Sequence, residues 1–465
     1  MGRTEKNGII EGVIWRQLLA FFFPILLGTL FQQLYNTVDA VVVGRFAGKA
    51  ALAAVGGSAA QILNLLIGFF VGLSSGATVI VSQFFGAEDA PGISRAVHTA
   101  MWLALAAGLA MTVLGVALAP WLLRQMNTPA DTLADSTLYL RTVFLSMVPA
   151  MVFNVGAGVL RAVGDSRRPL FFLIAACLVN VALDLLFVVG LGWSVLGVAV
   201  ATALAQLAAA LLVWVSLCRA KGSYRLDPRA LRADRALLKR TVQIGLPAGL
   251  QSVMYALSNM IITATINGFG TSTVAAWVTL GKVDGMYWMI NNAFGVSVMT
   301  FAGQNYGARR LDRAERSLFV CGGLNLAAAA AFSTAFFAFA RPVYSLFTRD
   351  PEVIDIALEM MRHITPWYFL FVPIEMISGA LRGMGRTLVP TMITAVGICV
   401  YRVIWMFAVV PAWHEIRAIA ISYPISWVMT AAAFIAYYPF ARRRLGFGRL
   451  KLGGGKEDGA EAPGH

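Results

Sequence analysis

The sequence predicts an all-α integral membrane protein with twelve transmembrane helices in two six-helix repeats. Three observations support this fold class: the composition, a series of long apolar runs, and an internal repeat. Of the 465 residues, 58% are hydrophobic and only 13% are charged. Soluble domains average about 25% charged residues. A polytopic membrane protein is therefore the class that the composition favours.

A helix that crosses a bilayer needs about 20 predominantly apolar residues. Runs of this kind predict first-half spans near 14–43, 52–81, 94–119, 137–159, 169–190 and 195–217. In the second half they predict spans near 241–267, 273–301, 316–340, 357–380, 388–410 and 418–440. Because the number of spans is even, both termini are expected on the same side of the membrane.

Basic residues predict which side that is. The net charge of +14 reflects 37 Lys and Arg against 23 Asp and Glu, and most of the basic residues lie in short segments between apolar runs. This placement indicates membrane topology, and nucleic acid is not an expected partner. The positive-inside rule makes three segments cytoplasmic. These are the N-terminus 1–13, the linker 218–240 and the tail 441–465, whose Gly-rich, charged sequence predicts disorder. The lobes are then 14–217 and 241–440.

Two loop motifs recur at a common offset of 221 residues. Gln83-Phe-Phe-Gly86-Ala87 follows the second span, and Gln304-Asn-Tyr-Gly307-Ala308 follows the eighth. Gly158-Val-Leu-Arg161-Ala-Val-Gly164 closes the fourth span, and Gly379-Ala-Leu-Arg382-Gly-Met-Gly385 closes the tenth. Each half has an even number of spans, so the repeats run parallel, with an expected cleft between them. The individual loop residues are expected to turn the chain and anchor it at the headgroups.

The first and fifth spans carry acidic residues. Asn180 and Asp184 lie four residues apart on the fifth span and therefore share one helical face. Asp39 ends a stripe on the first span that includes Gln32 and Asn36. A carboxylate in hydrocarbon costs roughly 3 kcal/mol on insertion scales. We therefore predict that Asp39 and Asp184, helped by Asn180, bind a coupling cation.

The identity of that cation stays open at this level. Asn154 on the fourth span and Thr202 on the sixth are further oxygen donors. Neutral oxygens suit a monovalent ion, so Na⁺ at Asp39 and Asp184 and a proton are both possible. Asn154 and Thr202 could equally make hydrogen bonds that serve only helix packing.

In the second half, the positions that match Asn180 and Asp184 are Tyr401 and Trp405. Aromatic side chains suit substrate contact, so we place Tyr401 in a substrate cleft with its neighbour Arg402. Tyr255 and Asn259, on the seventh span, match the stripe on the first span and are assigned to the same cleft, as are Gln32 and Asn36. Glu375 is a candidate charge partner for Arg402; alternatively, the two residues line the cleft independently. Lys282 and Asp284 are expected to have structural partners on other helices.

These motifs, in this order and with twelve spans, resemble the multidrug and toxic compound extrusion (MATE) family of secondary transporters. The resemblance covers about 14–440. It implies a V-shaped pair of lobes and export of cationic or amphipathic compounds in exchange for H⁺ or Na⁺. The NorM-like branch has a carboxylate on the seventh span, where this chain reads Pro247-Ala-Gly-Leu-Gln-Ser-Val-Met-Tyr255. Acids on the first and fifth spans resemble the DinF-like branch instead.

Two other functions are the alternatives to transport of this kind. A lipid-linked saccharide flippase of the same superfamily would need several intramembrane arginines. Arg402 is the one arginine that clearly falls inside a predicted span, so this function is disfavoured. A membrane-embedded enzyme would need clustered ligands, but the four cysteines and four histidines are scattered. We therefore expect a monomeric multi-pass antiporter of the bacterial inner membrane, with no cofactor, no enzymatic activity and no structural metal. The sequence does not identify its substrate.

Overall fold

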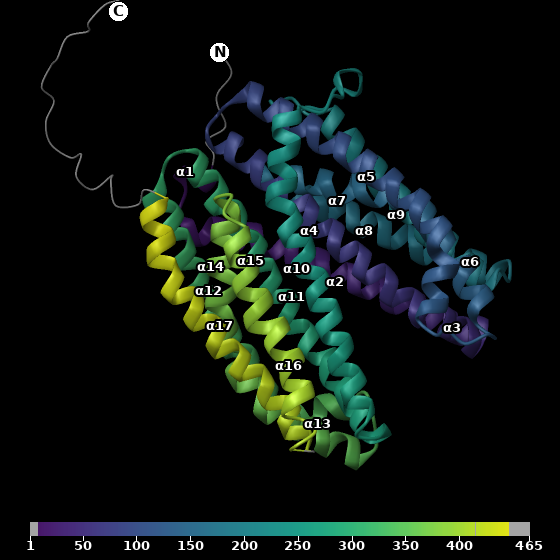
Figure 1. Ribbon diagram of the computed structural model, residues 1–465. Coiled ribbons are helices and arrows are strands. Elements are labelled where there is room, and N and C mark those ends of the chain that lie inside the picture. Colours follow the sequence, from purple (N-terminus) through teal and green to yellow (C-terminus); the bar gives the residue numbers. More distant parts are fainter. Residues whose placement is uncertain (1–7, 414, 446–465) are drawn as a thin grey trace, which may run out of the picture.

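The computed structural model describes residues 8–413 and 415–445, and all the regular secondary structure there is helical (Figure 1). In the first half the helices are α1 (Gly8–Glu11), α2 (Ile14–Val42), η1 (Val43–Ala47), α3 (Gly48–Gly56), α4 (Ser58–Gly86), α5 (Ala90–Gln125), α6 (Leu133–Leu145), α7 (Met147–Ala162), α8 (Arg167–Asp184), η2 (Leu185–Gly190) and α9 (Ser194–Cys218). The short helix η3 (Pro228–Ala230) lies in the segment between the halves.

The second half repeats this order. Its helices are α10 (Arg235–Asn267), α11 (Thr271–Gly307), α12 (Leu311–Ser345), α13 (Pro351–Ile364), η4 (Thr365–Leu370), α14 (Phe371–Gly383), α15 (Leu388–Thr394), η5 (Ala395–Val400), α16 (Tyr401–Ala408) and α17 (Ile416–Arg444). Most of the predicted tail, 446–465, lies outside the described residues.

Helices of membrane-spanning length confirm the predicted fold class. In the described ranges, nine helical units are long and apolar enough to cross a membrane, and a tenth, α6 with α7, is bent by 48°. The helices α10 and α11 complete the set of twelve; they have 33 and 37 residues but more polar sequences. The first unit continues through η1 and α3 to Gly56. The prediction that the second span begins at residue 52 is therefore wrong, because residues 52–56 belong to the first unit.

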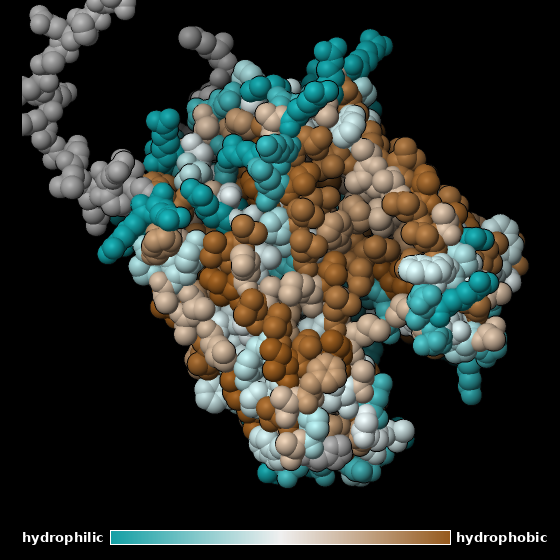
Figure 2. Space-filling model, viewed as in Figure 1, coloured by the Kyte–Doolittle hydropathy of each residue, from teal (hydrophilic) through white to brown (hydrophobic). Residues whose placement is uncertain are grey.

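The twelve units form two bundles that meet at one end and diverge toward the other (Figure 1). The end where they meet carries the start of α2, the segment 219–234 and the arginines that begin α12; we call it the basic end. Figure 2 shows apolar side chains covering the sides of both bundles, hydrophilic side chains at their ends, and a notch between the bundles opposite the basic end. This distribution fits a bilayer around the middle of the molecule.

The first helix of each half crosses to the other bundle. On α2, the Phe22 ring stacks on Phe294 of α11 at 4.0 Å between centroids. On α10, the start of the helix lies against α4, where a Cβ on Gly76 would come within 2.2 Å of the Thr241 carbonyl oxygen. Small residues at such crossings allow close approach of two helix backbones. The two bundles are therefore interlocked at the basic end.

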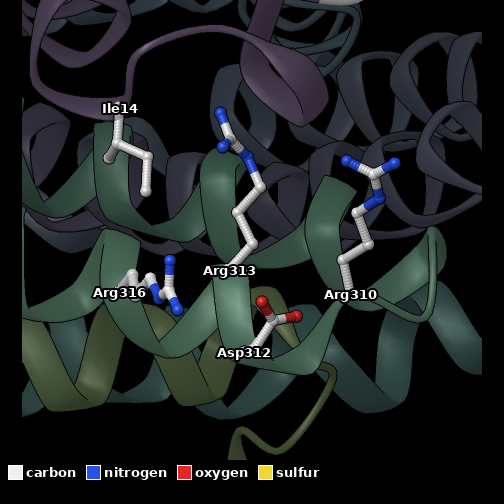
Figure 3. A pocket seen from close by; sticks show the side chains of 5 residues that line it. All are labelled: Ile14, Arg310, Asp312, Arg313 and Arg316. Carbon is white, nitrogen blue, oxygen red and sulfur yellow. The ribbon is translucent and has the colours of Figure 1, made fainter.

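Arginines at the start of α12 hold the N-terminal segment. Arg310 Nη1 donates to the Ile10 carbonyl at 3.0 Å, and Arg313 Nε donates to the Ile9 carbonyl at 3.0 Å. Figure 3 shows both side chains at a cavity of about 230 Å³, lined also by Ile14, Asp312 and Arg316. The segment that leads into α2 is thereby held to the second bundle, although most of α2 belongs to the first.

Candidate functional site

The predicted acids lie on two helices that end in the same way. Asp39 is in the last turn of α2, just before the π-helical turn η1, and Asp184 is the last residue of α8, just before the π-helical turn η2. Single π-helical turns inside longer helices are frequent at functional sites. Both side chains are buried: Asp39 is 8% exposed and Asp184 is fully buried.

The structure brings four of the five predicted cation-site residues together. The carboxyl group of Asp39 is within interaction range of the side chains of Asp184, Asn180 and Thr202. Asn180 is fully buried and Thr202 is 6% exposed. The helices α2, α8 and α9 therefore place two carboxyls, one amide and one hydroxyl in a single cluster, which we call the acid cluster.

Polar atoms of the acid cluster are left without good hydrogen bonds. Six buried atoms of the acid cluster have no partner of acceptable geometry among the described residues: Asp39 Oδ1, both carboxylate oxygens of Asp184, both amide atoms of Asn180 and Thr202 Oγ1. Buried polar groups are nearly always satisfied, and an unsatisfied one costs about 1–3 kcal/mol. So many in one place, most of them oxygens, fit a proton or a small hard cation.

Two tyrosines at the acid cluster were not predicted. Tyr35 lies close to both carboxyls and interacts with Gln206, and Tyr139 also lies close to both. Tyr35 could have been found, because it is one helical turn before Asp39 on the same face. Tyr139 comes from α6, and no local spacing relates it to the acids.

The fifth predicted residue, Asn154, has another contact. Its amide Nδ2 donates to the Ala150 carbonyl of its own helix at 2.8 Å. Gln32 and Asn36 are exposed on α2, while Asp39 on the same stripe is buried. The stripe therefore runs from an exposed helix surface into the acid cluster.

The second lobe holds a buried arginine in an aromatic setting. Arg402 is 4% exposed, its guanidinium lies 3.8 Å from the centroid of the Tyr423 ring, and its Nε donates to Ser426 Oγ at 3.0 Å. Tyr255 lies near Arg402. Of the other residues assigned to the cleft, Asn259 is exposed and Tyr401 is half-buried.

The suggested pairing of Glu375 with Arg402 is wrong. Glu375 instead accepts from Arg382 Nη2 at 3.2 Å, one of the motif arginines at the end of α14. Both belong to the same short helix, which makes the pair a local one. Arg402 is stabilised by cation–π contact instead, which is favourable when the cation is desolvated.

Asp284 has a structural partner, as predicted. Its carboxylate accepts a hydrogen bond from the Tyr368 hydroxyl, and the Tyr368 ring stacks on Tyr287 at 4.0 Å between centroids. Tyr287 in turn donates to the Tyr368 carbonyl at 2.9 Å. The acid of the second lobe therefore has a hydrogen-bond partner within an aromatic network, whereas among the described residues Asp184 and Asp39 Oδ1 have none.

Two pseudo-symmetric bundles of six membrane-length helices, with unpaired acids buried in one of them, define a polytopic membrane protein of the secondary transporter class. The family model MatE matches residues 24–186 and 247–407, one stretch in each half. The chain therefore belongs to the MatE family of transporters, and it is not an enzyme. The two matched stretches also confirm the internal repeat.

Relatives match over most of their length. The "Probable multidrug resistance protein YoeA" of Bacillus subtilis is 28% identical, with 96% of this chain and 98% of the relative covered. The "FAD transporter" of Shewanella oneidensis is 27% identical, with 76% and 78% covered. A solved structure described as "MATE in the bent conformation" has a TM-score of 0.87 at 21% identity, over 97% of this chain and 99% of that one. This last similarity concerns the fold.

Proposed function

We propose that the protein is a secondary active antiporter that exports cationic or amphipathic compounds in exchange for H⁺ or Na⁺. The observation that carries the proposal is the acid cluster. Two carboxyls share one buried site, and in the described residues neither forms a salt bridge. A chain retains such a costly arrangement in a membrane when it has a functional use, typically the binding and release of ions.

The acid cluster has the ligands for either ion. A proton shared by Asp39 and Asp184 would remove the repulsion between two neighbouring carboxylates. Sodium would take carboxylate oxygens, the Asn180 carbonyl and the Thr202 hydroxyl, since hard cations take oxygen ligands. Either ion neutralises charge that is otherwise buried. This placement of the acids supports the DinF-like pattern.

The substrate is proposed to bind between the lobes, in contact with Gln32, Asn36, Tyr255, Asn259, Tyr401 and Arg402. Relatives named multidrug resistance proteins support a broad set of small amphipathic compounds. Exposed amide side chains on α2 and aromatic rings on α16 offer adaptable polar and apolar contacts.

A second substrate class has its own support. Arg402 is buried, its Nη2 has no hydrogen-bond partner in the described chain, and its guanidinium lies against the Tyr423 and Trp427 rings. A relative is named a transporter of FAD, a molecule that carries phosphates. Amphipathic compounds with an anionic group are therefore a second candidate. Competition of flavin nucleotides with a cationic dye for efflux would distinguish the two classes.

Transport would follow alternating access of two lobes, 14–217 and 241–440, joined by the linker 218–240. The lobes meet at the basic end, which we place in the cytoplasm of a bacterial inner membrane by the positive-inside rule. The notch in Figure 2 then faces outward. Cation binding from outside would allow α2 to repack and weaken substrate binding, so that the inward gradient drives export. We propose that a monomer suffices, because each lobe contributes one side of the site.

The direct test is dye export from proteoliposomes. Purified protein is reconstituted with ethidium, and efflux is followed under an imposed proton gradient alone and then a sodium gradient alone. We expect one of the two gradients to drive ethidium against its own concentration gradient. If ethidium efflux were the same under a proton gradient, under a sodium gradient and with neither gradient, antiport would be contradicted.

A further inference from the structure

The two motif loops of each lobe meet the motif loops of the other lobe. Gln83 Nε2, at the end of α4, donates to the Gly383 carbonyl at 2.9 Å. Gln304 Nε2, at the end of α11, donates to the Ala162 carbonyl at 2.6 Å. The donors are separated by the repeat offset of 221 residues, and so are the acceptors. One glutamine of each lobe thus bonds to the matching carbonyl of the other.

Helix ends explain why these carbonyls accept. Ala162 is the last residue of α7 and Gly383 is the last residue of α14. The final carbonyls of a helix have no partner within the helix. In both loops the chain then turns through a left-handed glycine, Gly164 at φ 93° and Gly385 at φ 80°, which leaves the carbonyl open to the opposite lobe.

Close backbone contact accompanies the two bonds. A Cβ on Gly86 would lie 1.9 Å from the Gln304 carbonyl oxygen, and a Cβ on Gly307 would lie 1.9 Å from the Gln83 carbonyl oxygen. These positions again match at the repeat offset. The glycine of each Gln-x-x-Gly-Ala motif therefore allows α4 and α11 to touch directly where they cross between the lobes.

We infer that Gln83 and Gln304 form a reciprocal latch that holds the basic end closed and must release for the transporter to open there. A neutral amide suits this task, because water can replace the carbonyl when the lobes separate, so the bond is reversible. Arg240 Nη2 also donates to Gln83 Oε1 at 2.7 Å, which orients that amide. The inference rests on the proposed alternating access.

A disulfide between the lobes can report on the closed state. The Cβ of Ser82 is 3.3 Å from the Cβ position of Gly303, across the lobe boundary. The Cβ of Thr78 is 3.8 Å from the Cβ position of Gly158, within the first lobe. Disulfides have Cβ–Cβ separations of about 3.5–4.5 Å. The Thr78 and Gly158 positions lie within this range, and the Ser82 and Gly303 positions are about 0.2 Å closer than its lower limit. With the four native cysteines replaced, S82C/G303C should cross-link and lose ethidium efflux until reduced, whereas T78C/G158C should cross-link and keep it.

The latch itself is tested by its effect on that cross-link. In the S82C/G303C protein, Gln83→Ala with Gln304→Ala should slow disulfide formation on the order of tenfold, because two bonds that favour closure are lost. Each single substitution should have a smaller effect. Gln243→Ala is the control. It removes an exposed glutamine from the first half of α10, which begins at the basic end, and should leave the rate of disulfide formation unchanged. The intralobe T78C/G158C rate should not respond to either latch substitution.

An unchanged S82C/G303C rate in the double glutamine variant would overturn the latch. That result would leave the acid cluster and ion-driven efflux untouched. Failure of ion-driven efflux in the protein without substitutions would instead overturn the proposed function, whatever the cross-linking rates.

Discussion

At the residue scale, the intramembrane acids of the two lobes have different partners. Asp284 in the second lobe accepts from the Tyr368 hydroxyl. Asp39 and Asp184 in the first lobe have each other, Asn180 and Thr202. These neighbours are neutral or acidic, so none of them supplies a positive charge to balance the two carboxylates. A bound cation is the partner that we propose for them.

The two asparagines assigned to the cation site give a matched pair of variants. Asn180 belongs to the acid cluster, while the Asn154 amide donates within its own helix. In the proposed site the Asn180 carbonyl binds the cation, and a bond to a charged group is worth about 1.5–3 kcal/mol, so Asn180→Ala should raise the cation concentration for half-maximal efflux at least about tenfold. Asn154→Ala should change it less than about twofold. Equal effects of the two substitutions would contradict this assignment.

At the element scale, α2 and α10 join the lobes because each begins against the opposite bundle. The start of α2 packs Phe21 and Phe22 against Phe301 and Phe294 of α11. The rest of α2 runs along α8, where a Cβ on Gly28 would be 3.1 Å from Leu173. In the proposed mechanism, a change in packing at Asp39 would reach the second lobe along one continuous helix.

The crossing of α4 and α10 depends on glycine. Gly76→Val would force a side chain to within 2.2 Å of the Thr241 carbonyl oxygen. Overpacking of this kind costs about 1–3 kcal/mol, and more against backbone. We expect a clearly lower melting temperature in detergent. Gly281→Val is the control, because nothing lies within 4 Å of its Cβ position. Similar melting temperatures for the two variants would contradict close packing at the crossing.

At the scale of the whole molecule, the sequence predicted the features that depend on local pattern. Apolar runs predicted the spans, the common offset predicted two lobes, and the spacing of Asn180 and Asp184 predicted a shared face. Contacts between distant segments were not predictable in this way. Tyr139 reaches the acid cluster from α6, and Arg402 of α16 meets Tyr423 and Ser426 of α17.

The contacts made by the loop motifs also could not be predicted from the sequence. Their repetition was visible in the sequence, and it indicated turns at the membrane surface. That Gln83 bonds to Gly383, and Gln304 to Ala162, required the placement of the two lobes against each other. A repeat reveals equivalent positions, while the surface that those positions share follows from tertiary structure alone.

The central claim is that the acid cluster exchanges a cation for substrate, and Asp184→Asn tests it most directly. The amide keeps the shape of the side chain but cannot carry the charge that the cation neutralises. In proteoliposomes, we expect this variant to bind ethidium and to insert normally, yet to lose uphill efflux under the gradient that drives the unmodified protein. Uphill efflux at the unmodified rate would show that Asp184 does not couple the ion, and the proposed mechanism would fail.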